Sequence, residues 1–265
     1  MIILPLGGEM TRKVLKNKPL VEAIFELKWE LTQVGQGINI DPHYKILVGS
    51  LYSKLKDEYP YHEPLPAASL PDDIAGYVVQ HRFRKGENEW PLVQIGPGIL
   101  TVNDTNGYIW EDFEKIIISA VTSLFESYPN AEKIKINSLL LRYIDAIEFD
   151  YKSDDIYEFL SKNMKTGVKL YPDLFKDTGV EAVPSSFNLG FSYPCKKPEG
   201  SIHLKFMKGK KESIDGLIWE TMVQSTGDSA SQMKEKIQNW LTEAHDLSDD
   251  WFFKLIEGDL ERRFE

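Results

Sequence analysis

The stretch from Ala131 to Asp150 constrains the fold more than any other part of the chain. Its apolar run, from Ile134 to Phe149, is rich in β-branched and aromatic residues, which is typical of a strand buried on both faces. Two charged residues, Arg142 and Asp145, lie inside the run, where a charge is costly unless it is paired. We therefore expect a central strand with two similar halves of the chain arranged around it.

The segments on either side of this strand repeat one order: strand, helix, irregular segment, three strands, helix. In the first half, Lys18 to Glu30 alternates apolar and polar residues as a half-buried strand does. Asp41-Pro42 predicts a helix start, and four prolines between 59 and 76 predict a loop without regular structure. Three strands and a helix follow (77–84, 90–95, 99–103 and 110–128).

In the second half, Ser153-Asp-Asp155 predicts the start of a short helix after the central strand. An irregular segment at 165–185 precedes three strands, at 186–193, 201–208 and 214–224. A helix that starts at Asp228 or Ser229 carries an apolar stripe from Met233 to Ala244. Ser248-Asp-Asp250 then predicts the cap of a separate final helix.

This order predicts an α+β fold of two pseudo-repeated β-α-β-β-β-α units, each an antiparallel sheet with helices on one face. The units would span 18–130 and 131–265 after an N-terminal tail at 1–17. The alternative is one large curved sheet that grips a long helix. In the first arrangement the two sheets can join edge to edge and leave a broad concave face.

Composition places the chain among ordinary globular proteins, with 42% apolar and 27% charged residues. The net charge of −10 argues against broad binding to nucleic acid or to an anionic membrane. The single cysteine, Cys195, allows no internal disulfide, which fits a reducing compartment. No apolar run reaches membrane-spanning length, and the first residues lack the features of a signal peptide. We expect a cytoplasmic protein.

Four residues are candidates for ligand binding in a cleft between the halves: Glu22, His81, Arg142 and His203. Glu22 and Arg142 open their respective halves, so we expect an ion pair between their strands, with a substrate-anchoring role for Arg142 as the sharper alternative. His81 is expected to be a hydrogen-bonded sheet histidine, and His203 to lie on a polar face. Asp145 follows Arg142 by three positions, so the two should face opposite sides.

Three residues are candidates for protein contact: Tyr61 and His62 in the proline-rich loop, and Trp90 beside Pro91. Aromatic residues in exposed loops are frequent at interfaces. The irregular segment 165–185 is a candidate lid over the cleft, because long irregular segments within compact domains are often functional.

Signatures of catalysis and of cofactor binding are missing from the sequence. The five histidines show no zinc-site spacing, and Gly96-Pro-Gly98 is a turn rather than a phosphate loop, because no lysine, hydroxyl or helix follows it. No metal or cofactor is expected. The sequence leaves catalysis open and favours a non-catalytic protein.

Several segments together resemble a sporadically distributed, uncharacterised family of bacterial proteins of about this length. They are Pro19-Leu-Val-Glu-Ala-Ile-Phe-Glu26, the stretch from Val93 to Asn103 with Tyr108 and Trp110 after it, Leu141-Arg-Tyr-Ile-Asp145, and Ala244 to Ile256. The resemblance covers most of the chain. It implies no specific activity, and it implies an association with mobile or defence-related genes.

Three functions follow in order of preference. The first is a non-catalytic protein-binding or regulatory module, which engages another protein or a second copy of itself. The second is a small-molecule-binding protein or enzyme with a cleft between its halves. The third is nucleic-acid binding through a saddle of two sheets, against which the net charge argues.

Overall fold

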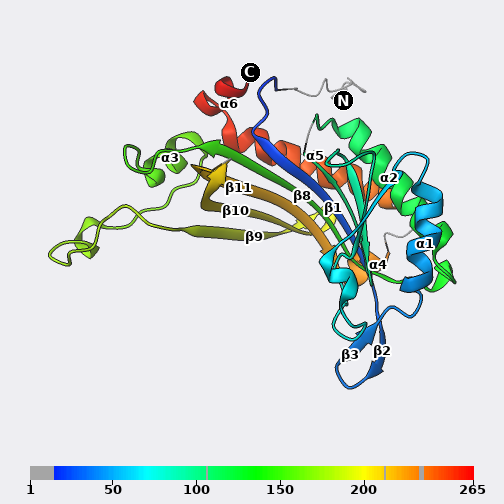
Figure 1. Cartoon of the computed structure of the whole chain (residues 1–265). Helices are drawn as coiled ribbons and strands as arrows, with labels where there is room; N and C mark the ends of the chain where they lie inside the picture. The colour runs from blue at the N-terminus through cyan, green and yellow to red at the C-terminus, as the bar shows by residue number, and fades with distance from the viewer. Residues whose placement is uncertain (1–14, 106, 212, 233–235) are drawn as a thin grey trace, which may run out of the picture.

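A nine-stranded antiparallel sheet organises the computed structural model, which describes residues 15–105, 107–211, 213–232 and 236–265 (Figure 1). Its order is β4-β5-β6-β7-β1-β8-β11-β10-β9. The strands are β1 (Leu20–Trp29), β4 (Tyr61–Pro64), β5 (His81–Arg84), β6 (Leu92–Gly96), β7 (Ile99–Asp104), β8 (Ile136–Glu148), β9 (Asn188–Lys196), β10 (Glu199–Lys211) and β11 (Ile214–Thr226). A separate hairpin pairs β2 (Thr32–Gly35) with β3 (Ile38–Ile40).

Helices in the described residues occupy the connections and the C-terminal part of the chain. They are α1 (Tyr44–Leu55), α2 (Trp110–Ser127), α3 (Ile156–Asn163), α4 (Asp228–Ser231), α5 (Ile237–Ile256) and α6 (Asp259–Phe264). Short 3₁₀ turns lie at η1 (Pro66–Ser69), η2 (Ala131–Lys133) and η3 (Pro172–Leu174). Among these described helices, none is both long enough and apolar enough to cross a membrane.

The strand order shows the internal repeat. β1 and β8, the first strands of the two halves, pair at the middle of the sheet. Outward from them, each half places its last strand next (β7 or β11) and then the strands before it in reverse order. The predicted α+β fold with two pseudo-repeated units is therefore confirmed. The two sets of strands form one continuous sheet. The alternative also expected a long helix, and α5 is such a helix.

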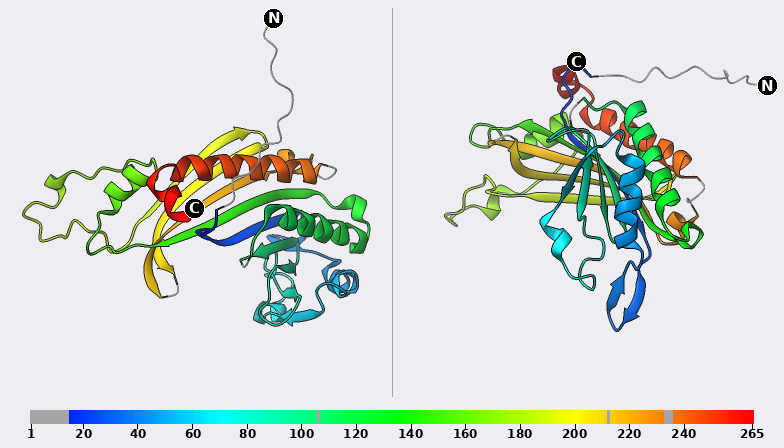
Figure 2. Two further views of the ribbon diagram at one scale, coloured as in Figure 1. Left: turned by 90° about the horizontal axis from the view of Figure 1, so that it is seen from above. Right: turned by 45° about the vertical axis from the view of Figure 1, so that its right-hand side comes forward.

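Side-chain alternation decides which face of the sheet each residue occupies. In β1, Ala23, Phe25, Leu27 and Trp29 are each at most 1% exposed and lie in the core under α1, α2 and α5. Burying each of the larger side chains contributes about 1.5–3 kcal/mol. Figure 2 shows α2 and α5 over the same face of the sheet, and the two helices contact each other.

β8 uses the same alternation, in register with β1. Leu139 and Leu141 pair with Leu27 and Phe25 and share their core face. Arg142 pairs with Ile24 and therefore lies on the opposite face. The prediction that Arg142 and Asp145 face opposite sides is confirmed, because Asp145 lines a cavity under the helices.

The proline-rich loop contains a strand that the sequence did not predict. β4 pairs with β5 from Tyr61↔Arg84 to Pro64↔His81 and forms one edge of the sheet. A proline is tolerated at an edge because its missing N–H costs no ladder hydrogen bond there. The adjacent predicted strand at 77–84 is shorter than expected, since β5 begins at His81.

One expected helix start is displaced and a second is wrong. α1 begins at Tyr44, three residues after Asp41, whose carboxylate accepts hydrogen bonds from the His43 N–H (3.1 Å), Trp29 Nε1 (3.1 Å) and Tyr128 Oη (2.9 Å). Ser248-Asp-Asp250 lies inside α5 and caps nothing. There Ser248 is 1% exposed against the sheet side, so tertiary packing overrides the local capping preference. The predicted stripe residue Met233 lies outside the described residues.

The segment between α3 and β9 projects away from the sheet (Figure 1). We call residues 165–187 the arm. Large apolar side chains on it are strongly exposed, between 45% and 64%: Leu170, Tyr171, Leu174, Val180 and Val183.

Candidate functional site

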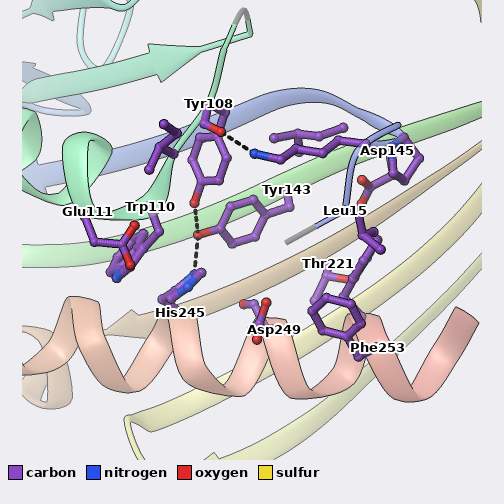
Figure 3. Close-up of a pocket in the computed structure, with 16 residues that line it drawn as sticks. Leu15, Tyr108, Trp110, Glu111, Tyr143, Asp145, Thr221, His245, Asp249 and Phe253 are labelled. Atoms are coloured by element: carbon purple, nitrogen blue, oxygen red, sulfur yellow. Dashed lines mark hydrogen bonds between the residues drawn. The ribbon is translucent and has the colours of Figure 1, made fainter. Parts of the chain in front are cut away.

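A cavity of about 260 Å³ lies on the helix-facing side of the sheet, where both halves of the chain meet (Figure 3). The first half contributes the start of β1 and the start of α2. The second half contributes β8, β11 and α5. A space of this size is far larger than a single water molecule requires, and it suits a small organic molecule.

A chain of hydrogen bonds crosses one wall of the cavity. Tyr108 Oη and Tyr143 Oη are 3.0 Å apart, and Tyr143 Oη is 2.9 Å from His245 Nδ1. The His245 ring stacks on Trp110 with centroids 3.9 Å apart and an interplanar angle of 11°. These contacts fix four side chains from the α2 start, β8 and α5, so this wall is preorganised.

Asp145 brings a carboxyl group into the cavity from β8. It is 2% exposed, and burial raises its pKa from the ordinary value of 3.8 to about 8. Desolvation disfavours the charged form of an acid, so Asp145 is mainly protonated at neutral pH in the unliganded protein. A raised pKa of this kind is more frequent at functional sites than elsewhere.

An irregularity in β1 lies beside Asp145. The β1–β8 register shifts between Leu20, which pairs with Asp145, and Glu22, which pairs with Ile144, so Val21 is the extra residue of a bulge. Pro19, just before the strand, also lines the cavity and has no N–H to donate. Bulges bend a strand and interrupt its ladder, which opens space next to the carboxyl group.

Two buried hydroxyl groups that line the cavity have no hydrogen-bond partner: Thr221 Oγ1 on β11 and Ser248 Oγ on α5. Their residues are 2% and 1% exposed. Leaving a buried polar group unpaired costs about 1–3 kcal/mol, so native proteins rarely do so without a reason. A ligand that hydrogen-bonds to these groups would remove that cost.

Charged side chains lie at the more open side. Lys18 Nζ donates to the Tyr108 carbonyl oxygen at 2.6 Å and lies 5.9 Å from the centroid of the Tyr108 ring. Glu111 and Asp249 also line the cavity. Among the described residues no group of three or more His, Cys, Asp or Glu side chains has the geometry to hold a metal ion. The arrangement is suited to binding and orienting a small polar molecule.

The four predicted ligand residues do not form one site. Arg142 and His203 lie on the sheet face opposite the helices, in register through Met222, so they are about 10 Å apart by strand spacing. Glu22 occupies that face too, where Asn103 Nδ2 donates to its carboxylate at 2.8 Å. None of the four predicted residues lines the cavity. Their individual roles in ligand binding stay predictions.

The expected pairing of Arg142 with Glu22 is wrong. Arg142 Nε lies 3.4 Å from the carboxylate of Glu220 on β11, whereas its neighbour on β1 is Ile24. The β1–β8 register therefore offsets Glu22 from Arg142 by two positions. His203 Nε2 is 2.8 Å from Ser201 Oγ, which confirms its place on the polar face.

His81 lies on the helix-facing side of the sheet, next to α1. Its Nδ1 is 2.9 Å from His62 Nε2, which confirms the predicted hydrogen-bonded histidine. Burial, and secondarily the charge of His62, lowers the pKa of His81.

The three protein-contact candidates gather near the β4 edge. Tyr61 is 39% exposed, His62 stacks on Phe83, and Trp90 is half-buried under Arg84.

Residues 165–185 do not line the cavity, and the arm points away from the sheet (Figure 1), so a role as a lid stays a prediction. Cys195 lies in strand β9. Burial raises the pKa of its thiol, which disfavours the reactive thiolate.

Sequence reasoning expected a cleft between the halves but missed the residues that line this cavity, although a signal for them was present. The segments that carry the family resemblance supply much of the lining: Pro19 and Leu20, Tyr108 and Trp110, Tyr143 and Asp145, and His245, Phe252 and Phe253. Each pattern alone also fits a core element. Only the fold shows that all of them border one space.

Comparisons with known proteins add little to this geometry. No family model matches the chain, and no curated protein matches it. Among the solved structures, it is similar to one described as "Methanococcus jannaschii TBP", with 13% identity, 86% of this chain and 99% of that chain covered, and a TM-score of 0.25. A likeness at this level carries no argument about function.

Proposed function

We propose that this protein binds a small organic molecule in the cavity between its two halves. The observation that carries the proposal is the convergence there of a buried acid, Asp145, with two unpartnered hydroxyl groups, on Thr221 and Ser248. Folding alone would favour apolar side chains at these positions. The presence of these polar groups next to an open space supports a role in recognition.

The walls support the same proposal. Aromatic side chains supply apolar contact area, and the chain from Tyr108 to His245 holds polar atoms at fixed positions. A mostly apolar pocket with a few placed polar groups is the usual form of a small-molecule site. This reverses the order of the first two functions expected from the sequence.

The experiment blocks the cavity without disturbing the core. Ile109 lines the cavity and is 51% exposed, so Ile109→Trp should narrow the opening and leave the fold intact. Ile74→Trp is the matched control at a 61% exposed position outside the cavity. A library of small metabolites would be screened by thermal shift, and each hit would be titrated against the three proteins. We expect hits that bind wild type and Ile74→Trp and not Ile109→Trp. Equal binding to all three would refute the proposal.

A second candidate function is protein binding by self-association through the arm. The exposed apolar side chains that the arm carries favour it, since their burial between two copies would remove apolar surface from water. Sedimentation velocity would compare wild type with Leu174→Asp and Val180→Asp. A dimer that dissociates in the variants is expected, and a monomeric wild type would exclude it. Membership of the uncharacterised bacterial family and a cytoplasmic location stay predictions from the sequence.

A further inference from the structure

The cavity offers an uncommon electrostatic environment at Asp145. Burial is the cause of its raised pKa, and among the residues that the structure describes no positive charge counteracts it. Among the lining residues that the structure describes, Lys18 carries the permanent positive charge, and it donates to the Tyr108 main chain. A cation placed beside Asp145 would restore the ionised carboxylate and recover the lost electrostatic energy.

Two hydroxyl groups that line the cavity with Asp145 can accept hydrogen bonds from a donor-rich group. Thr221 pairs with Tyr143 on the β8–β11 ladder, so it is the diagonal neighbour of Asp145 on the same face, about 7–8 Å away between main chains. Its hydroxyl has no partner, and neither has that of Ser248. A carboxylate and two hydroxyls can all accept hydrogen bonds, and an ammonium group carries donors only.

Aromatic rings complete the match. Tyr143, Phe252 and Phe253 line the cavity, and their faces attract cations. Within the protein, the Tyr108 ring already has a cation over it, since Lys18 Nζ lies 5.9 Å from the ring centroid. Ligand pockets that combine rings with a carboxylate are suited to organic ammonium groups.

From these observations we infer that the ligand is a small organic amine, whose ammonium group pairs with the Asp145 carboxylate and whose apolar body lies among the aromatic rings. The inference rests on the proposed function. An anionic ligand could not form an ion pair with Asp145 and would further disfavour its ionised form. A neutral ligand would accept a hydrogen bond from the protonated carboxyl group.

The pH dependence of affinity separates a cation from a neutral ligand. A cation requires the ionised carboxylate, so below about pH 8 its binding releases a proton, and its affinity should rise about tenfold per pH unit. A neutral ligand that accepts a hydrogen bond requires the protonated carboxyl group, so its affinity is independent of pH below about pH 8 and falls above it. The other titratable groups that line this space are Lys18 before β1, Tyr108 and Glu111 at α2, Tyr143 on β8, and His245 and Asp249 on α5.

The experiment is isothermal titration calorimetry at pH 6, 7 and 8, in two buffers of different ionisation enthalpy that report the protons released. The probes are butylamine and 2-phenylethylamine, with butan-1-ol, 2-phenylethanol, butanoate and phenylacetate as matched neutral and anionic compounds. Asp145→Asn removes the charge, and Asp173→Asn, at an exposed arm position, is the control for losing one carboxyl group.

We expect the amines to bind with release of close to one proton at pH 6, and Asp145→Asn to weaken them at least tenfold at pH 8 and to remove the pH dependence. Asp173→Asn should match wild type. Binding by the alcohols or acids in preference to the amines, or amine binding that Asp145→Asn leaves unchanged, overturns the inference and leaves the proposed function standing. A lack of amine binding also overturns it. If, in addition, the metabolite screen shows no effect of Ile109→Trp, the proposed function fails as well.

Discussion

Replacing Asp145 by asparagine should raise the stability of the unliganded protein relative to wild type progressively as the pH rises. The side chain is 2% exposed, and its pKa rises from 3.8 to about 8 on folding. Between these values the folded state holds a proton that the unfolded state has released. Stability therefore falls as the pH rises through this window, and it stops falling above about pH 8. Asparagine has nearly the same shape and does not titrate, so the variant escapes this loss.

The size of the effect follows from the width of the window. Within the window, each pH unit lowers the free energy of unfolding of wild type by ~1.4 kcal/mol. Relative to the difference at pH 5, the variant should gain up to ~4 kcal/mol over wild type by pH 8, an upper limit because local rearrangement reduces the effect of burial. A gain of even half this size is a large fraction of the stability of a typical domain.

The assay is urea denaturation followed by tryptophan fluorescence at pH 5, 6, 7 and 8, with Asp173→Asn as the control. Unchanged m-values would show that the compared transitions expose the same surface. The quantity of interest is the difference in free energy of unfolding between variant and wild type. A difference that stays constant from pH 5 to 8 would refute the reasoning. A stable variant that no longer binds amines would show that wild type retains Asp145 for binding, at a cost in stability.

Three other substitutions test separate parts of the structure. Gly96→Ala places a Cβ 2.0 Å from the main-chain oxygen of Val78, so it should cost about 3 kcal/mol or more, measured by thermal denaturation; a variant as stable as wild type would contradict the close approach. Arg142→Ala removes a partly exposed ion pair with Glu220 and should cost about 1 kcal/mol or less, with ligand affinity in the cavity unchanged; loss of binding would place the site on the other face. Tyr143→Phe removes the central hydroxyl of the hydrogen-bond chain and should cost about 1–3 kcal/mol in urea denaturation; a neutral effect would show that the chain contributes nothing to stability.

Much of the fold could be predicted from local patterns. The alternation in β1 identified its buried face, and the spacing of apolar residues identified α2 between Trp110 and Ser127. The repeated order of elements predicted the class and the pseudo-repeat. These predictions succeed because each depends on a period of two or of 3.6 residues within one segment.

Predictions that depended on neighbours in space failed more often. Ser248 carries a strong capping signal, yet it lies inside α5 because that helix continues to bury Leu255 and Ile256. The partner of Arg142 could not be read from the sequence, because register between strands is set by the whole sheet. β4 was missed because Pro64 in it and the prolines around it argue against a strand, and only its edge position makes Pro64 acceptable.

The sequence by itself therefore determined the α+β class, the repeated order and the opposite orientation of Arg142 and Asp145. Tertiary structure alone decided that Asp145 meets Tyr143, Thr221 and His245 around one cavity. Tyr143 and His245 are 102 positions apart in the chain and 2.9 Å apart in the fold. The physical reason is that a residue's face depends on its immediate neighbours in the chain, whereas a cavity depends on how distant elements pack and on where a bulge leaves the ladder open.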